Sequence, residues 1–368
     1  MGKAGGRVYQ VIMYGLCRGC NTDDILISVF IRYSSLVNPY LSVFISLTKP
    51  LLRWGGFSVM PSGVVVLFFI RRLTKCQLDE KIQAGSSPNQ YFFMNQSEVK
   101  IAWFGKHFGE EPPLTGHQAQ GAGTIFFSHC HLHCVFCQNF QISQQGQGRF
   151  YQTEQLAKIM LDLQDSDAVN IDLVSPTLWW QPLKQAIISA KRRGLTVPIV
   201  WNSNAYESLD LLREFTGLID IYLPDFKYGD ANVGLKYSGI KNYPETALGA
   251  IGEMFKQVGY LQVDRGGLAT KGLIVRHLVL PNNLENSFKA LECLAGFKKN
   301  IHISLMNQYT PLYRAAEFAE INRSLSAKEY EQVVDYFYEL GLVNGWVQAE
   351  MNGPDLVPDF KKKQPFAK

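Results

Sequence analysis

The chain has 368 residues, of which 46% are hydrophobic, 12% aromatic and 18% charged, so it is able to bury one large core or two smaller ones. This composition excludes a globally disordered chain, and its 31 glycines and 16 prolines follow no short repeat, which excludes collagen-like and solenoid folds. The net charge is +4, but nine basic and only two acidic residues fall within residues 1–75, so the remainder is slightly acidic and we expect no nucleic-acid partner.

Residues 1–98 form an apolar and basic N-terminal segment without a recognisable pattern. Its longest apolar run, residues 57–70, contains Pro61 and is shorter than the roughly 20 apolar residues that cross a bilayer, so a membrane role is not expected. Cys17 and Cys20 form a lone C-x-x-C pair, which is more simply a chance spacing than a metal site. No cleavage site for a signal peptide is apparent, and we expect a cytoplasmic protein.

From residue 120 onward, short apolar runs alternate with stretches of helical period, which is typical of repeated β-α units. Helices are expected over residues 153–164, 179–193, 243–258 and 286–299, and Ser326 with Glu329 forms a capping box that starts a further helix. The expected strands are apolar on both faces, as buried parallel strands are. They are residues 124–128, 169–175, 197–202, 219–223, 273–280 and 302–306.

Six parallel strands with helical crossovers predict either a doubly wound α/β sheet or a partial barrel. Periodicity does not choose between these folds. Both place the active site at the carboxyl ends of the strands. The residues that directly follow each strand are therefore the candidates for chemistry.

Three cysteines follow the first of these strands. Cys130, Cys134 and Cys137 have the spacing C-x-x-x-C-x-x-C, and no fourth cysteine lies in the same loop. Three thiolates on one loop suit a soft metal or an iron–sulfur cluster. If the occupant is a 4Fe-4S cluster, one iron stays open for a substrate or cofactor.

At these residues the sequence resembles the radical SAM (S-adenosylmethionine) superfamily, whose motif places an aromatic residue directly before the third cysteine, as Phe136 does here. Within it the chain resembles mostly uncharacterised relatives of the pyruvate formate-lyase activating enzyme. That resemblance covers about residues 99–348, leaving 349–368 as a polar tail. It rests on the segments 107–113, 123–128, 134–139, 223–228, 272–281 and 304–309.

The resemblance implies a partial (β/α)6 TIM-like barrel behind a divergent N-terminal extension. It implies a 4Fe-4S cluster and S-adenosylmethionine as cofactors, with reductive cleavage of the latter to a 5′-deoxyadenosyl radical that abstracts hydrogen. A one-electron donor such as flavodoxin or ferredoxin would then be a partner. The substrate would be a glycyl-radical protein or, equally, a small molecule.

Polar residues at the expected strand ends are candidates for binding the cofactor, each with a simpler alternative. Ser175 and Thr177 stand where many family members carry a Gly-Gly-Glu segment. The simpler alternative is that these two residues only form a turn that leads into the next helix. Asn202, with Ser203 and Asn204, would bind ribose or carboxylate, or cap a helix. Phe136 and Asn139 belong to the cysteine segment itself.

Charged residues follow the fourth and fifth strands. Asp225 and Lys227 are catalytic candidates, although a buried ion pair is the simpler interpretation. Arg276 and His277 lie in an otherwise apolar run, so Arg276 is expected to meet a carboxylate, either that of S-adenosylmethionine or Asp225.

The cysteine loop also holds three histidines where related proteins tend to carry Gly, Asn and Arg. His129, His131 and His133 make a Cys3His zinc site the main alternative to a cluster. In that case the protein would be a non-catalytic interaction module.

Overall fold

The computed structural model describes residues 97–116, 120–298, 300–349 and 357–366, together with the backbone of three N-terminal strands. The chain divides into two compact units, Met1–Gln83 and Ala84–Lys368. In the first unit β1 (Val8–Tyr14), β2 (Leu26–Arg32) and β3 (Ser42–Leu47) form an antiparallel sheet in that order. The Cys17–Cys20 pair and the run 57–70 lie outside the described residues.

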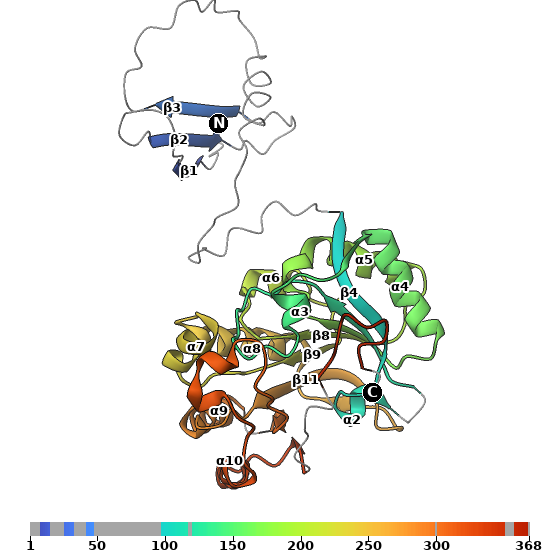
Figure 1. Cartoon of the computed structure of the whole chain (residues 1–368). Helices are drawn as coiled ribbons and strands as arrows, with labels where there is room; N and C mark the ends of the chain where they lie inside the picture. The colour runs from blue at the N-terminus through green and yellow to red at the C-terminus, as the bar shows by residue number, and fades with distance from the viewer. Residues whose placement is uncertain are drawn as a thin grey trace, which may run out of the picture. The chain divides into compact units, whose positions relative to one another are not determined.

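The second unit is built on one large sheet (Figure 1). Its strand order is β13-β12-β11-β9-β8-β7-β5-β4-β6, and the short β10 (Gln262–Val263) pairs with β11. Six of these strands are the six expected from the sequence, and they pair in parallel. They are β5 (Ala122–Phe127), β7 (Ile171–Val174), β8 (Ile199–Ser203), β9 (Ile221–Pro224), β11 (Ala269–Leu278) and β12 (His302–Met306).

Three further strands that the sequence did not predict extend the sheet at its ends. β13 (Gly345–Val347) adds in parallel to β12, whereas β4 (Glu98–His107) adds antiparallel to β5 and β6 (Arg149–Gln152) adds antiparallel to β4. β13 and β6 stand at opposite ends of the strand order, so the sheet is a partial barrel rather than a closed one.

Helices cover the outer face of the sheet, as Figure 1 shows. The predicted capping box of α10 is confirmed, because Ser326 and Glu329 each accept a hydrogen bond from the other's backbone N–H. Among the described residues no helix is long and apolar enough to span a bilayer. The long helices are α4 (Thr153–Asp165), α5 (Trp180–Arg192), α8 (Tyr243–Val258), α9 (Leu284–Phe297) and α10 (Ala327–Glu339). The shorter ones are α2 (Pro112–Thr115), α3 (Phe140–Ser143), η2 (Thr177–Trp179), α6 (Leu209–Arg213), α7 (Ala231–Ser238), η3 (Ala315–Glu317) and η4 (Ala319–Ile321).

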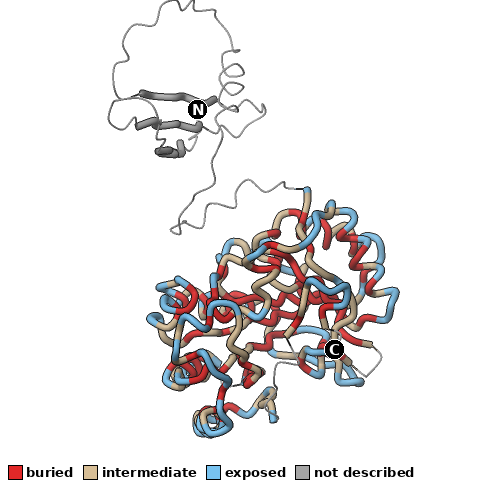
Figure 2. The backbone as a smooth tube through the Cα atoms, in the orientation of Figure 1, coloured by how far each residue is buried: buried red, intermediate tan, exposed pale blue. Residues whose placement is uncertain are grey.

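The two faces of the strands have different surroundings. Side chains such as Leu173, Trp201 and Tyr222 belong to the large apolar core that the helices share, and Figure 2 shows this burial along the central strands. On the other face, a small cluster that includes Val200, Ile274 and Leu114 of α2 fills the interior of the barrel. Side chains alternate along a strand, so every second residue lies on this inner face. The next residues on this face, toward the carboxyl ends of the strands, are polar. The interior above the small cluster is therefore where a site is able to form.

Candidate active site

The inner face opens into a cavity of about 950 Å³ at the carboxyl ends of the strands. A cavity of this size falls in the range of small-molecule and cofactor sites. Ten of the twelve residues predicted for the site line it. They are Cys130, Cys134, Phe136, Cys137, Asn139, Ser175, Asn202, Asp225, Lys227 and Arg276.

The chain turns sharply after three consecutive strands of the sheet. His129 follows β5 by two residues, Ser175 follows β7 directly and Ala205 follows β8 by two residues, with φ of 69°, 56° and 61°. Residues other than glycine adopt this left-handed conformation at a cost of about 1 kcal/mol or more, and such strain gathers at functional sites. The turn at Ser175 brings it into the cavity wall.

The cysteine loop is held by contacts from distant elements. The backbone N–H of His129 donates to Ile142 O (2.9 Å), and that of Val135 donates to Tyr237 O (2.9 Å). Phe136 packs edge-on against Tyr309, with ring centroids 5.8 Å apart. The aromatic position before the third cysteine therefore anchors the loop to the end of the barrel.

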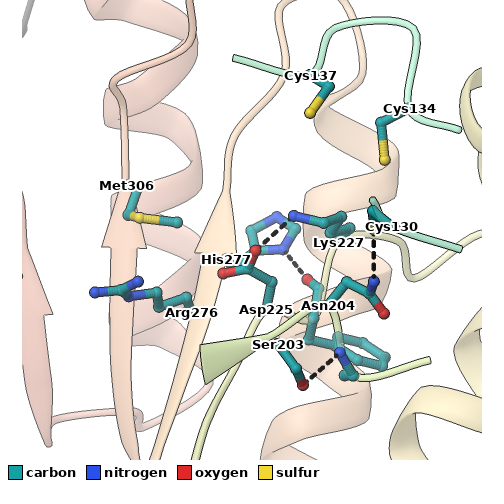
Figure 3. A network of polar contacts seen from close by, with 12 residues as sticks. Cys130, Cys134, Cys137, Ser203, Asn204, Asp225, Lys227, Arg276, His277 and Met306 are labelled. Atoms are coloured by element: carbon teal, nitrogen blue, oxygen red, sulfur yellow. Dashed lines mark hydrogen bonds and ion pairs between the residues drawn. The ribbon is translucent and has the colours of Figure 1, made fainter. Parts of the chain in front are cut away.

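Each thiol has a polar neighbour within hydrogen-bond distance. Figure 3 shows the one from Asn204 to Cys130. Asn204 Nδ2 donates to Cys130 Sγ (3.4 Å), Ser238 Oγ donates to Cys134 Sγ (3.0 Å), and Ser143 Oγ lies 3.2 Å from Cys137 Sγ. Donors of this kind stabilise a thiolate and tune a metal that it binds.

Burial and the neighbouring Cys134 thiol raise the pKa of Cys130 to about 12 and that of Cys137 to about 11. The thiolate is the form that binds metal, so these buried sulfurs lose their protons in exchange for a cationic occupant. Three thiols on the wall of a large cavity fit a 4Fe-4S cluster with one iron left for a further ligand.

The three histidines of the loop face other partners. His131 Nε2 donates to Tyr206 O (2.7 Å), and His133 Nδ1 lies 2.8 Å from Gln144 Oε1 on the surface. His129 lies against Trp179, with ring centroids 6.3 Å apart. Among the described residues, no group of three or more His, Cys, Asp or Glu side chains is arranged to share one metal ion. In this arrangement each of the three histidines contacts a partner other than the thiols.

Asp225 and Lys227 form the ion pair that was the simpler interpretation of their spacing, with Lys227 Nζ 2.6 Å from Asp225 Oδ2. Burial lowers the pKa of Lys227, but Asp225 and the nearby Cys134 and Cys137 thiols outweigh it and raise this pKa. Tyr243 Oη lies 2.6 Å from Asp225 O and accepts a hydrogen bond from the Lys227 N–H (2.9 Å). The pair is thereby fixed at the cavity wall with its cation near the thiols.

Arg276 meets carboxylates, as expected, but within the chain these are Glu110 and Glu111 rather than Asp225. Its Nε donates to Glu111 Oε1 (2.8 Å), and its Nη2 contacts both Glu110 and Glu111. Asp225 instead pairs with Lys227. Figure 3 shows Arg276 extending away from the three cysteines. The expectation that Arg276 pairs with Asp225 is wrong because the segment before α2 brings two glutamates into the barrel interior.

The carboxylates around Arg276 differ in their electrostatics. Burial alone would raise the pKa of Glu111, but the charge and hydrogen bonds of Arg276 outweigh it and hold this pKa below its usual value. Asp172 is also fully buried, and burial together with Glu110 raises its pKa well above the usual value. Thr124 Oγ1 (3.4 Å) and Asn202 Nδ2 (3.5 Å) donate to its Oδ2.

Two predicted residues do not reach the cavity. Thr177 Oγ1 donates to the buried Glu207 (2.6 Å), which also accepts from Trp201 Nε1 (3.0 Å). His277 lies on the outer face of β11, with Nδ1 2.7 Å from Phe226 O and Nε2 3.0 Å from Ser287 Oγ. Arg276 and His277 are adjacent on one strand and therefore point to opposite faces, so only the former enters the site.

The sequence analysis missed three acidic residues of the site. Glu110 and Glu111 precede α2, outside the expected strand ends, and their signal was an acidic pair followed by two prolines. Asp172 was visible as a single carboxylate inside an apolar strand, where an ionisable group needs a reason.

A model of a 4Fe-4S single cluster domain matches residues 119–237. This stretch contains all three cysteines and the strands from β5 to β9. The thiol loop follows the first parallel strand of the partial barrel and lies within the stretch that matches this 4Fe-4S domain.

A protein of Methanocaldococcus jannaschii described as uncharacterised, MJ0674, is 32% identical over 250 residues, which are 64% of this chain and 67% of that protein. The chain belongs to the same family as this archaeal protein.

Two solved structures are similar at low sequence identity. Methylornithine synthase shares 14% identity and a TM-score of 0.40 over 57% of this chain and 59% of its own. A domain of the pyruvate-formate lyase-activating enzyme from Bacteroides vulgatus shares 14% identity and a TM-score of 0.34 over 47% of this chain and 94% of its own.

Proposed function

We propose that this protein is a radical SAM enzyme that abstracts hydrogen from its substrate. The observation that carries the proposal is the set of three cavity-lining thiols with Asn, Ser and Ser side chains beside their sulfurs. A reduced 4Fe-4S cluster held there would supply one electron for the cleavage of S-adenosylmethionine to methionine and a 5′-deoxyadenosyl radical, which would take a hydrogen atom from the substrate and become 5′-deoxyadenosine.

The residues of the chain contribute binding and shape. Cys130, Cys134 and Cys137 would hold the cluster, and Ser175 and Asn202, which line the same cavity, would contact S-adenosylmethionine. Phe136 and Asn139 complete the wall beside the thiols. Asp225 holds the Lys227 ammonium near the sulfurs, where its positive charge favours thiolates.

An open iron in a cavity is sensitive to oxygen, so the proposal includes a reducing compartment and a one-electron donor such as flavodoxin or ferredoxin. The family resemblance makes a glycyl-radical protein one candidate substrate, and the size of the cavity makes a small molecule the other.

The test is anaerobic purification followed by iron and sulfide analysis and electron paramagnetic resonance with and without S-adenosylmethionine. We expect about four iron and four sulfide ions per chain. We also expect a reduced-cluster signal that the cofactor changes, and formation of 5′-deoxyadenosine. Cys134→Ala should lose the iron, whereas Cys293→Ala, a half-buried cysteine in α9, should keep it. Stoichiometric zinc without sulfide in protein never exposed to air would refute the proposal.

A further inference from the structure

Residues 357–366 form a segment that we name the C-terminal strap. They belong to the expected polar tail, but they pack on the barrel. Five of them belong to the wall of the cavity that holds the three thiols. These are Val357, Pro358, Lys362, Pro365 and Phe366. The strap therefore faces the same space in which the cofactor and substrate would lie.

Aromatic contacts fix one end of the strap to β4 and β5. The ring of Phe366 lies 4.2 Å from that of His107, 5.2 Å from Trp103 in an edge-on arrangement and 5.5 Å from Phe126, measured between centroids. Phe360 packs on the same Phe126 at 5.3 Å. Aromatic rings at these distances attract one another beyond the burial of their area.

Hydrogen bonds fix the strap to the helix that follows the cysteine loop. Gln141 of α3 donates from Nε2 to Asp359 Oδ1 (3.0 Å) and accepts at Oε1 from the Phe360 N–H (2.7 Å). The strap also closes on itself, because the Asp359 N–H donates to Pro365 O (3.0 Å). A side chain that both donates to and accepts from one segment specifies its position.

The strap joins parts of the barrel that the sheet does not join. It follows β13, which ends one side of the strand order, and it packs on β4 and β5, which lie toward the other. Figure 1 shows the C-terminal segment, in dark red, lying across β4. Trp346 of β13 and Phe126 of β5 line the cavity from opposite parts of the strand order. The strap, which contacts α3 and β4, lines it as well.

We propose that the strap is the outer wall of the substrate cavity and that the substrate is a small molecule enclosed between the strap and the cysteine loop. In this proposal the strap, which lines the cavity and contacts α3 and β4, closes this side of the cavity to a loop of a folded protein. Phe366 is a positioning residue in this scheme, because it holds the strap closed without contacting the thiols. This inference rests on the proposed function for the chemistry, but the wall itself is a property of the chain alone.

The experiment measures access to the thiols in the full-length, cluster-free protein. Iodoacetamide is the small reagent and a polyethylene-glycol maleimide is the large one, and peptide mass spectrometry reads modification at Cys130, Cys134 and Cys137 separately. The variants are Phe366→Ala and Asp359→Ala, which remove the aromatic and polar fixings of the strap in turn. The matched control is Tyr338→Ala, an exposed aromatic on α10.

In the unmodified chain we expect iodoacetamide to react much faster than the large reagent. Phe366→Ala should accelerate the large reagent about tenfold, because it removes the apolar contacts that hold the strap. Asp359→Ala should accelerate it about two- to tenfold, because it removes one hydrogen bond to Gln141. The control should change neither rate. Equal rates for the large reagent in the unmodified chain and both strap variants would overturn the proposal.

The substrate class has its own test. Generation of a glycyl radical in a partner protein by the unmodified holoenzyme, seen by electron paramagnetic resonance, would overturn the small-molecule assignment. Failure of the proposed function would appear instead as absence of sulfide and of 5′-deoxyadenosine in the unmodified protein. Reagent access does not depend on either result, so the two failures are distinguishable.

Discussion

Replacing Arg276 by methionine tests the electrostatics of the barrel interior. The side chains of Arg276, Glu110 and Glu111 are only 12%, 8% and 6% exposed, so the two carboxylates would be left buried without their guanidinium. Removing one partner of a buried ion pair typically costs about 3 to 5 kcal/mol, because the remaining charge stays out of water. We expect the free energy of unfolding to fall by this amount at pH 8.

The size of this loss should depend on pH with a definite sign. In the unmodified chain the pKa of Glu111 is lowered, so its pairing contributes stability above the unfolded pKa and loses it as the pH falls through the folded pKa. In Arg276→Met the charge and hydrogen bonds of Arg276, which lower the pKa of Glu111 most, are gone; burial then acts against only the hydrogen bonds from Ser304 and the backbone, so this pKa rises. The variant's penalty is then largest at high pH and shrinks at lower pH as the Glu111 carboxyl takes up a proton.

The assay is urea unfolding of the full-length chain, followed by circular dichroism at pH 8 and pH 5. The matched control is the triple variant Glu110→Gln, Glu111→Gln, Arg276→Met, which removes all three charges and should recover most of the lost stability. An equal loss at both pH values, or a triple variant no more stable than Arg276→Met, would refute the electrostatic argument.

Three further predictions concern buried polar groups. Asp172→Asn should stabilise the protein by about 1 to 3 kcal/mol at pH 8, because burial raises the folded pKa of this carboxyl. The gain in stability should vanish as the pH falls toward 4. A urea midpoint that does not rise at pH 8 would contradict this prediction. Burial lowers the pKa of His277 to about 4, so the free energy of unfolding should fall by about 3 kcal/mol between pH 6.5 and 4. His277→Asn should lack this fall when urea unfolding is measured over the same pH range. Tyr243→Phe should cost about 1 to 3 kcal/mol in thermal unfolding, because Lys227 N and Asp225 O lose a buried partner; no loss would mean that water replaces the hydroxyl.

Much of the barrel was predictable because its signals are local. The six parallel strands are short apolar runs buried on both faces, and all six were found to within a few residues of their observed bounds. The helix that begins after Ser326 was marked by its capping box. The edge strands β6 and β13, and β4 beside β6, escaped because their partly exposed residues carry no continuous apolar run.

The candidate site was predictable where one segment carries the whole pattern. Cys130, Phe136 and Cys137 line the cavity together because their spacing within a single loop already places them there. Arg276 and His277 could not be told apart in the same way. Which face of a strand points inward is decided by what packs against it, and neighbouring residues have opposite outcomes.

The sequence by itself determined the three-thiol loop, the alternation of strands and helices and the burial of the strands on both faces. Each of these depends on residues close together along the chain. Only the tertiary structure decided the partners of Arg276, which are more than 160 residues away, and the position of the strap, whose Asp359 meets Gln141 across 218 residues. Contacts at such separations depend on how the whole sheet is ordered and curved. No local pattern of residue types encodes that geometry.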